Sequence, residues 1–268
     1  MHSAPDPLDG QPPTPQAALR PRDLLIETVL VLGVSLGASA IWSALSLIRK
    51  LLAETGLRAQ TTAMNSSVVP DHPWLDLAYQ LVGIGLALVP VVLALHLLGR
   101  DHGQPRPLRR LGLDRGHAGA DLVRGLALSA AIGLPGLALY LVSRELGLNT
   151  TVAAADVSGA WWTVPVLVLA AAQNAVLEEV IMIGYLFARW LGAGWSTVAV
   201  VVTSALIRGS YHLYQGFGGF AGNVVMGLIF GLIYVRTKRI APLVVAHTVL
   251  DVVAFVGYAL LRDHLAWL

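Results

Sequence analysis

The chain of 268 residues contains no cysteine and few charged residues. Without cysteine it can form no disulfide, use no thiolate nucleophile and build no cysteine-ligated zinc site, so any metal would need histidine and carboxylate ligands. Only 13% of the residues are charged while 56% are hydrophobic, which leaves too little polar surface for a soluble domain. The net charge of +2 belongs to the loops and does not indicate nucleic-acid binding.

The N-terminal segment also lacks the basic start and apolar core of a signal peptide. Residues 1–22 are polar and rich in proline, and we expect a disordered tail there. No repeat of fixed period is present, which weakens the case for a transporter built from inverted repeats.

Long apolar runs make up most of the remaining chain. A run of about 20 apolar residues is long enough to cross about 30 Å of hydrocarbon as a helix. The runs predict an all-α, polytopic transmembrane bundle with about seven spans, six to eight being compatible. The expected spans lie at 24–48, 75–98, 121–143, 162–188, 196–214, 220–235 and 241–261. We expect the sixth to be short for a full crossing and the fourth to tilt or break near Gln173 and Asn174.

Basic residues in the loops indicate the orientation in the cell membrane, because lysine and arginine are retained on the cytoplasmic side. The stretch 99–120 holds five arginines, and the connection 236–240 holds three basic residues. Both are predicted to be cytoplasmic, which places the N-terminus in the cytoplasm. Arg49 and Lys50 then fall on the outer side, against the rule.

Six ionisable side chains interrupt the apolar C-terminal third. A charge near the centre of a bilayer costs at least about 2.5 to 3.5 kcal/mol on insertion scales, so such residues are candidates for function. They form three pairs on three apolar segments: Glu178 with Glu179, Arg208 with His212, and His247 with Asp251.

The spacing within each pair predicts how the side chains point. Adjacent residues of a helix point about 100° apart, so Glu178 and Glu179 are expected to face different neighbours and to have different roles. The members of the other two pairs lie four residues apart and share one face of their helix. Tyr211 and Tyr214 could orient His212 or a water, with a packing role equally open.

The residue types suggest hydrolysis of a peptide carbonyl in one of two ways. His212, His247 and Asp251 offer ligands for Zn²⁺ or a similar divalent ion, which leaves Glu178 free to take a proton from a bound water. A metal-free arrangement uses the same residues. In it Glu178 and His212 activate the water, and His247 with Asp251 clamps the oxyanion.

The order of these residues resembles the CPBP family of intramembrane metalloproteases, a group that includes CAAX proteases and bacterial Abi proteins. The resemblance covers about residues 160–262. The family motif Glu-Glu-xxx-Arg falls on Glu178, Glu179 and Ile183, the motif Phe-xxx-His on Arg208 and His212, and the motif His-xxx-Asn or Asp on His247 and Asp251.

The resemblance implies a helical membrane core in which Glu178 activates water. It places His212, His247 and Asp251 around that water or metal, and it makes Glu179 a further candidate catalytic residue. The chain then divides into the tail at 1–22, N-terminal transmembrane helices with a basic cytoplasmic loop at 23–160, the catalytic core at 161–262 and a short tail at 263–268.

Two positions depart from the family pattern together. Ile183 stands where the family has arginine, and Arg208 stands where it has phenylalanine. We expect Arg208 to supply, from the neighbouring helix, the guanidinium that is missing at position 183. Glu179 would then keep a basic partner, and Arg208 would support the site.

These observations favour an intramembrane endopeptidase that cuts a peptide or a membrane-protein tail near the cytoplasmic face of the bilayer. Two alternatives stay open. One is a non-enzymatic membrane protein, such as an immunity or scaffold protein, that keeps its polar core for helix packing. The other is a transporter coupled to ions or protons. No nucleic-acid partner is expected, and the oligomeric state is not predicted.

Overall fold

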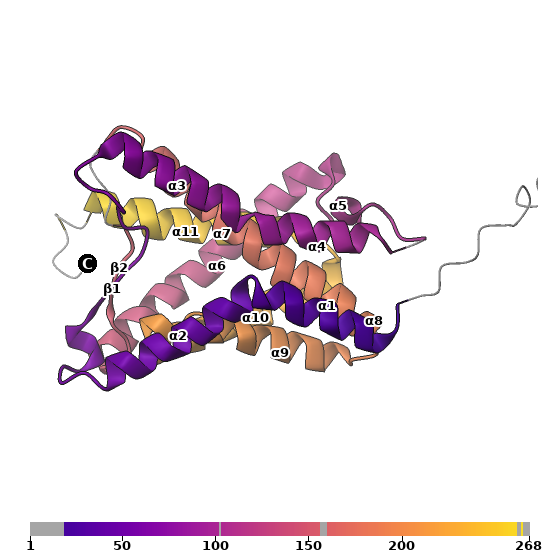
Figure 1. The fold of residues 1–268 in the computed structure, drawn as a ribbon, viewed down its shortest axis with the longest axis horizontal. Helices are drawn as coiled ribbons and strands as arrows, with labels where there is room; N and C mark the ends of the chain where they lie inside the picture. The colour runs from indigo at the N-terminus through magenta and orange to yellow at the C-terminus, as the bar shows by residue number, and fades with distance from the viewer. Residues whose placement is uncertain (1–18, 102, 156–159, 262–263, 265–268) are drawn as a thin grey trace, which may run out of the picture.

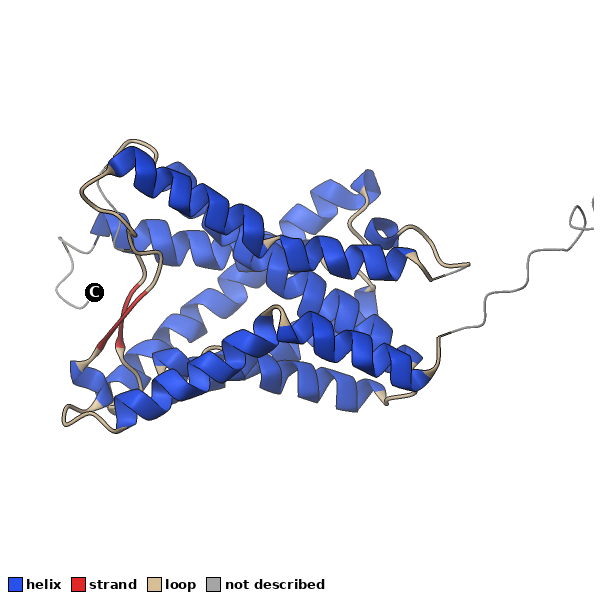
Figure 2. Ribbon diagram, in the orientation of Figure 1, coloured by secondary structure: helices blue, strands red, loops and turns tan. Residues whose placement is uncertain are grey.

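A computed structural model describes residues 19–101, 103–155, 160–261 and 264. They form a bundle of helices with one small two-stranded sheet (Figures 1 and 2). The predicted all-α membrane bundle is confirmed. Most of the predicted N-terminal tail, residues 1–18, lies outside the described residues, and the first helix begins at Pro21. Of the predicted C-terminal tail only residue 264 is described.

The first two helices form a bent pair. Helix α1 (Pro21–Gly33) and helix α2 (Leu36–Leu51) meet at an angle of 53°. Pro21 begins α1, where its missing N–H costs no helical hydrogen bond, and Asp23 places a negative charge near the positive end of the helix dipole.

The next apolar run forms one span with a local interruption. Helix α3 (Pro73–Ala87) and helix α4 (Val89–Gly99) meet at Leu88. Pro90 lies in the first turn of α4 and has no N–H to donate to the preceding turn, which explains the interruption. The two helices together span 27 residues.

The arginine-rich loop and the long helix that follows it lead to the second half of the bundle. The loop contains the short helix α5 (Pro107–Arg110) and the 3₁₀ turn η2 (Arg115–His117). Helix α6 (Ala118–Glu145) then continues for 28 residues with Pro135 inside it.

The central element of the bundle is a helix in three parts. Helix α7 (Thr163–Glu178), the π-helical segment η3 (Glu179–Tyr185) and helix α8 (Leu186–Gly192) follow one another without a break. Of their most apolar stretch 56% is buried, against 11% to 28% in the other four long apolar helices, so this helix is the core. The break expected near Gln173 and Asn174 is absent, because α7 continues through both residues.

The last three helices carry the remaining ionisable residues. Helix α9 (Thr197–Ser210) is followed by the 3₁₀ turn η4 (Leu213–Gln215), helix α10 (Phe217–Thr237) and helix α11 (Ala241–Leu261). Ser196 caps α9 by accepting a hydrogen bond from the Ala199 N–H at 3.2 Å. The sixth predicted span is not short, since α10 has 21 residues.

The number of candidate spans reaches the lower end of the predicted range of six to eight. In the described part of the chain five helices are long and apolar enough to cross a membrane, or six if the bent pair α1–α2 is one span. The difference from about seven spans lies in α9, which has only 14 residues. At about 1.5 Å per residue such a helix is shorter than about 30 Å of hydrocarbon.

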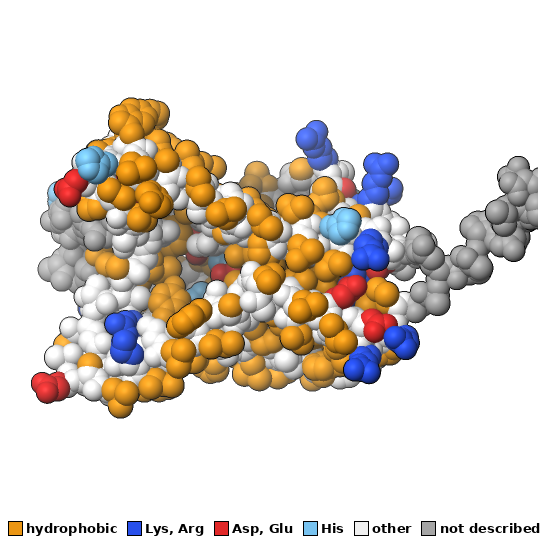
Figure 3. All heavy atoms as spheres, viewed as in Figure 1, with side chains coloured by type: hydrophobic (Ala, Val, Ile, Leu, Met, Phe, Trp, Pro, Cys, Tyr) orange, Lys and Arg blue, Asp and Glu red, His pale blue; other side chains and the backbone are white. Residues whose placement is uncertain are grey.

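The surface of the bundle suits a lipid environment. Large apolar side chains point outward along the helices, among them Trp42, Leu134 and Val198 with exposed fractions of 71%, 76% and 73%. Figure 3 shows this apolar surface, with most of the visible Lys and Arg side chains gathered at the end that carries α5 and the start of α1. The protein is therefore a multi-pass membrane protein, and its orientation stays a prediction from loop charge.

Ion pairs fix that arginine-rich end. Arg239 contacts Asp114 at 2.8 Å and Asp121 at 2.7 Å, so it ties the last loop both to the loop before α6 and to the first turn of α6. The hydrogen bond from Arg239 lowers the pKa of Asp114 to about 2. Arg189 of α8 likewise contacts Asp101 at 2.8 Å and Glu27 of α1 at 3.2 Å.

Lys50 explains one conflict with the orientation rule. Its side chain is buried and donates hydrogen bonds to the Thr62 hydroxyl and the Tyr214 backbone carbonyl. A lysine held inside the protein in this way acts as a structural cross-link between segments, so it carries less weight as a topology signal than a solvated loop lysine. Arg49 remains on the outer side in the predicted orientation.

Candidate active site

The two adjacent acids lie at the junction between α7 and the π-helical segment. Glu178 is the last residue of α7 and Glu179 the first residue of η3. Glu178 is 8% exposed and Glu179 is fully buried. A π-helical turn shifts the angular spacing of the residues that follow, and such turns often occur at functional sites.

The two acids face different neighbours, as their adjacent positions predicted. The Tyr211 hydroxyl donates a hydrogen bond to Oε2 of Glu178 at 2.7 Å. Oε1 of Glu179 instead accepts hydrogen bonds from Arg208 and from Nδ1 of His247, the latter at 2.8 Å. The two carboxylates therefore have separate environments, and only Glu178 retains some exposure.

Arg208 lies between the two acids. Its Nη2 donates to Glu179 and lies 3.5 Å from Oε2 of Glu178. The guanidinium carbon also lies 5.4 Å from the centre of the Phe230 ring, close enough for a cation–π contact. The expected pairing of Arg208 with Glu179 is therefore present, while Ile183 is fully buried in the apolar core.

His212 lies just beyond the end of α9, in the turn that leads to η4. Its Nδ1 is 3.0 Å from the backbone carbonyl oxygen of Arg208. Because a carbonyl oxygen can only accept, Nδ1 carries the proton and Nε2 keeps its lone pair. The rings of Tyr211 and Tyr214 flank the imidazole, with centroid distances of 4.8 and 6.3 Å.

His247 connects the acids of the central helix to α11. Its Nδ1 contacts Glu179, and its Nε2 lies 3.7 Å from Oδ1 of Asp251, one helical turn further along. The second distance is too long for a direct hydrogen bond. His247 and Asp251 therefore lie on the same face of α11, as predicted. Nε2 of His247 lies near the Asp251 carboxylate but makes no hydrogen bond to it.

Two residues of the cluster carried no clear signal in the sequence. Tyr211 was expected to act on His212 or to pack, but its hydroxyl bonds Glu178. Asn174 was expected at a helix break, but it lies inside α7 and its side chain interacts with Asp251. Asn174 precedes Glu178 by four residues, so the two share a face of α7, and that spacing is the one signal that could have identified it.

The donor atoms do not fit the predicted divalent metal. Across the residues that the structure describes, no group of three or more histidine or carboxylate side chains could hold a metal ion, so His212, His247 and Asp251 do not form such a group. The contact of His247 with Glu179 uses Nδ1 and leaves Nε2 free, whereas the cationic Arg208 lies beside both acids of the cluster. A second cation there would be repelled by the guanidinium.

The cluster is open to one side of the bundle. Figure 3 shows red acidic and pale-blue histidine atoms at the bottom of a recess between α3 on one side and α2 on the other. A molecule approaching from that side could reach ionisable groups without the bundle unfolding. This bundle of apolar helices with acids, imidazoles and a guanidinium buried at its centre defines a membrane protein with a polar intramembrane site.

The comparison with protein families agrees with this class. Residues 160–253 match the family model described as Type II CAAX prenyl endopeptidase Rce1-like. The resemblance seen in the sequence is confirmed for this stretch, which is similar to the Rce1-like CAAX protease family and contains all six ionisable residues of the site. The family implies a protease, and thus a hydrolase. No curated protein and no solved structure matches the chain significantly.

Proposed function

We propose that this protein is an intramembrane endopeptidase in which Glu178 activates water for attack on a peptide carbonyl. One observation carries the proposal: Glu178 is a nearly buried carboxylate held at 2.7 Å by Tyr211, and it interacts electrostatically with His247, Arg208 and His212. A general base must be held in place while one of its oxygens remains able to take a proton. Tyr211 and Arg208 both approach Oε2, so Oε1 is the atom free to act.

The surrounding groups have distinct parts in the proposed reaction. His212 offers the lone pair of Nε2 as a second acceptor for the water. His247 already donates its Nδ1 proton to Glu179, so it would act as an imidazolium whose Nε2 N–H donates to the developing oxyanion. Glu179 positions that ring from its other side, and Arg208 positions Glu179. Asp251, itself held by Asn174, faces the same ring nitrogen.

The bonds and protons of the proposed step balance without a metal. Glu178 takes a proton from water as the water oxygen bonds to the peptide carbonyl carbon, and the carbonyl oxygen becomes an oxyanion. The C–N bond then breaks, and the protonated Glu178 returns its proton to the leaving amine. The products are a carboxyl-terminal and an amino-terminal fragment. The substrate is a peptide or a membrane-protein segment that enters through the recess between α2 and α3.

Substitution Glu178→Gln tests the proposal, because it keeps the shape of the side chain and removes its basicity. Loss of a general base lowers turnover by about 10²- to 10⁴-fold. The measurement is cleavage of a quenched fluorescent peptide pool by the full chain in lipid nanodiscs. Glu54→Gln, at an exposed acid beyond α2, is the matched control and should cleave at the wild-type rate.

The same variant separates the enzyme from the alternatives. Loss of cleavage at normal abundance supports the peptidase. Equal cleavage by Glu178→Gln and the wild type would refute the role of Glu178. Loss of abundance, with no cleavage by the wild type, would favour a scaffold protein whose polar cluster serves helix packing. Proton or ion flux in liposomes that depends on Glu178 would favour a transporter.

A further inference from the structure

The small sheet lies beside the polar cluster and connects its two sides. Strand β1 (Thr61–Ala63) pairs in parallel with strand β2 (Thr151–Ala153). At one end the Thr150 N–H donates to the backbone carbonyl of Gln215 at 2.9 Å. Gln215 follows His212 by three residues. At the other end Ala155 packs in a cluster with Phe255, one turn of α11 beyond Asp251. The strands therefore run between the segment that carries His212 and the helix that carries His247.

The outer edge of β2 is already occupied. In the observed register Thr62 lies opposite Val152, and the backbone N–H and C=O groups of Thr151 and Ala153 point toward β1. The Thr151 N–H donates to the Gln60 carbonyl at 3.0 Å, and the Met64 N–H donates to the Ala153 carbonyl at 2.9 Å. The N–H of Val152 points the other way and donates to the Tyr140 hydroxyl of α6 at 3.0 Å. Helix α6 thus covers this edge.

The outer edge of β1 is free. Because Thr62 and Met64 supply the hydrogen bonds to β2, the N–H and C=O groups of Thr61 and Ala63 point away from it. Both residues are exposed, and neither backbone makes a hydrogen bond within the described part of the chain. Neither side chain is charged or a proline, so β1 lacks the features that usually prevent another strand from pairing with an exposed edge.

We propose that the free edge of β1 binds the extended backbone of the peptide substrate. The inference rests on the proposed peptidase function and adds to it how the substrate is held. Hydrolysis needs a carbonyl carbon that water can reach, and a helical substrate engages its carbonyls in its own hydrogen bonds. A strand added to a sheet edge keeps the chain extended and is held by main-chain hydrogen bonds, so it accepts many sequences.

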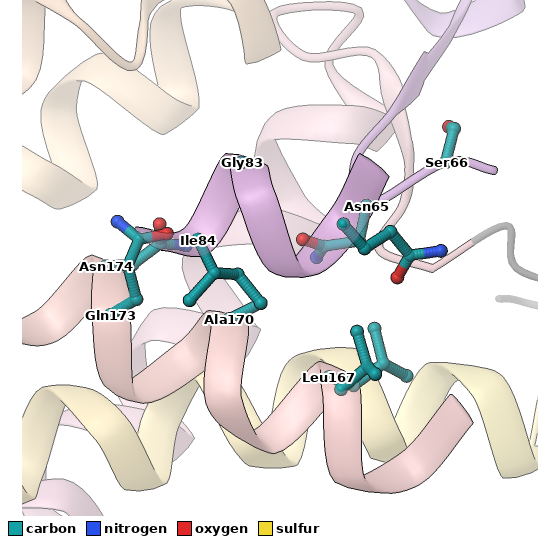
Figure 4. A pocket seen from close by; sticks show the side chains of 10 residues that line it. Asn65, Ser66, Gly83, Ile84, Leu167, Ala170, Gln173 and Asn174 are labelled. Carbon is teal, nitrogen blue, oxygen red and sulfur yellow. The ribbon is translucent and has the colours of Figure 1, made fainter. Parts of the chain in front are cut away.

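A cavity lined by both polar and apolar side chains continues this track toward the polar cluster. It begins beside Asn65 and Ser66, directly after β1, and has a volume of about 160 Å³. Its wall includes Gln80 of α3 and the neighbours Gln173 and Asn174 of α7 (Figure 4). The volume suits a side chain rather than one water, whose share of liquid is about 30 Å³.

The chemistry of that wall fits a peptide. Side-chain amides both donate and accept hydrogen bonds, as a peptide group does. Asn174 lies one helical turn before Glu178 and interacts with Asp251, so a chain that occupies the cavity comes close to the proposed reaction centre. Ile84 and Leu167, which are labelled in Figure 4, add apolar side chains to the wall of the cavity. The segment of substrate beside the scissile bond is therefore expected to place a side chain with an apolar stem here.

Backbone methylation of a cleaved peptide tests the strand pairing. A peptide that the wild type cleaves and Glu178→Gln does not is selected from the fluorescent pool, and each of its amides is then N-methylated in turn. Pairing with one edge engages every second residue, so methylation should lower kcat/KM about tenfold at alternate positions on one side of the cut. Equal sensitivity at consecutive positions would overturn the proposal.

Cysteine trapping gives a second measurement that does not depend on turnover. The chain has no cysteine, so Ala63→Cys in the Glu178→Gln background introduces a single thiol at the free edge. The same peptide with single cysteines along its length should form a disulfide with Ala63→Cys at least tenfold faster than with Ala59→Cys. Ala59 is also exposed and lies before β1, so it is the matched control. Equal trapping rates would overturn the proposal.

Failure of this inference differs from failure of the proposed function. If no peptide is cleaved, or if Glu178→Gln cleaves as well as the wild type, the peptidase is refuted and the peptide track with it. If cleavage depends on Glu178 but methylation and trapping show no preference for the edge of β1, only the track is refuted.

Discussion

Replacing Arg208 with phenylalanine removes the guanidinium that separates the two acids of the central helix. Arg208 is 1% exposed and its main partner Glu179 is fully buried. Phenylalanine is the residue that the related family has at this position, so the volume is expected to be tolerated. The main consequence is therefore electrostatic: a buried carboxylate loses one of its two basic partners, and His247 is the other.

The magnitude follows from that geometry. Removing one member of a buried ion pair costs about 3 to 5 kcal/mol, because the remaining charge stays out of water without compensation. Here His247 still contacts Glu179 at 2.8 Å, which favours the lower end of the range. A loss of about 3 kcal/mol corresponds to a fall of roughly 150-fold in the folding equilibrium constant. A loss of stability of this size also predicts a lower abundance of Arg208→Phe in cells.

Two second-site changes should restore stability by different routes. Ile183→Arg places a guanidinium one turn after Glu179, where the family has it. Glu179→Gln removes the charge that lost its partner. Each is expected to recover at least about 1 kcal/mol when it is combined with Arg208→Phe, as coupled neighbours do in double-mutant cycles. Alone, each should destabilise, because Ile183→Arg adds an unpaired charge to the core and Glu179→Gln leaves Arg208 without its main partner.

The assay is reversible unfolding in mixed micelles, followed by tryptophan fluorescence of the purified full-length variants. Arg208→Phe as stable as the wild type would refute the reading of Arg208 as the compensating charge. So would double variants no more stable than Arg208→Phe, since the loss would then come from packing against Phe230 instead of from the charge on Glu179.

Two further predictions concern metal content and pH. Purified protein is expected to contain no stoichiometric divalent metal and to keep its cleavage rate after treatment with a chelator; a metal bound in the wild type and lost in both His212→Ala and His247→Ala would instead support the metal-bound water. For pH, the lowered pKa of Asp114, about 2 against an ordinary 3.8, means that its pairing with Arg239 stabilises the fold fully above about pH 4. This contribution is lost as the pH falls through about 2, so the melting temperatures of the wild type and Asp114→Asn should differ at pH 5 and converge at pH 2. A difference that is unchanged at pH 2 would contradict this account.

Much of the architecture followed from the sequence because it depends on local composition. Apolar runs long enough to cross a bilayer must become helices, since only internal hydrogen bonding satisfies their backbone in lipid. The positions of the ionisable pairs followed from helical spacing, and the contact between Arg208 and Glu179 followed from the paired departure at Ile183 and Arg208. Burying a charge in an apolar interior is costly unless an opposite charge pairs with it, so the residue types predicted that Arg208 pairs with Glu179.

The errors arose where the helices have irregular ends. The segment 196–214 is mostly apolar and was expected to be one helix, but α9 ends at Ser210, so His212 lies in a turn beside Tyr211, the partner of Glu178. The composition of the segment does not predict where α9 ends, because tertiary contacts favour the turn that follows Ser210. The sheet was not predicted either, since three-residue strands are too short to show a periodic pattern.

The sequence by itself determined which groups are present: helices that suit a membrane, two acids on adjacent positions, a third acid at Asp251, two imidazoles, one arginine and no thiol. Only the tertiary structure decided how these groups are divided. It assigned Tyr211 to Glu178 and gave both Arg208 and His247 to Glu179. Among the described residues it formed no group of three histidine and carboxylate side chains that could hold a metal ion. The physical reason is that helical spacing fixes which side chains share a face, whereas distances between helices depend on how the π-helical segment and the short α9 pack.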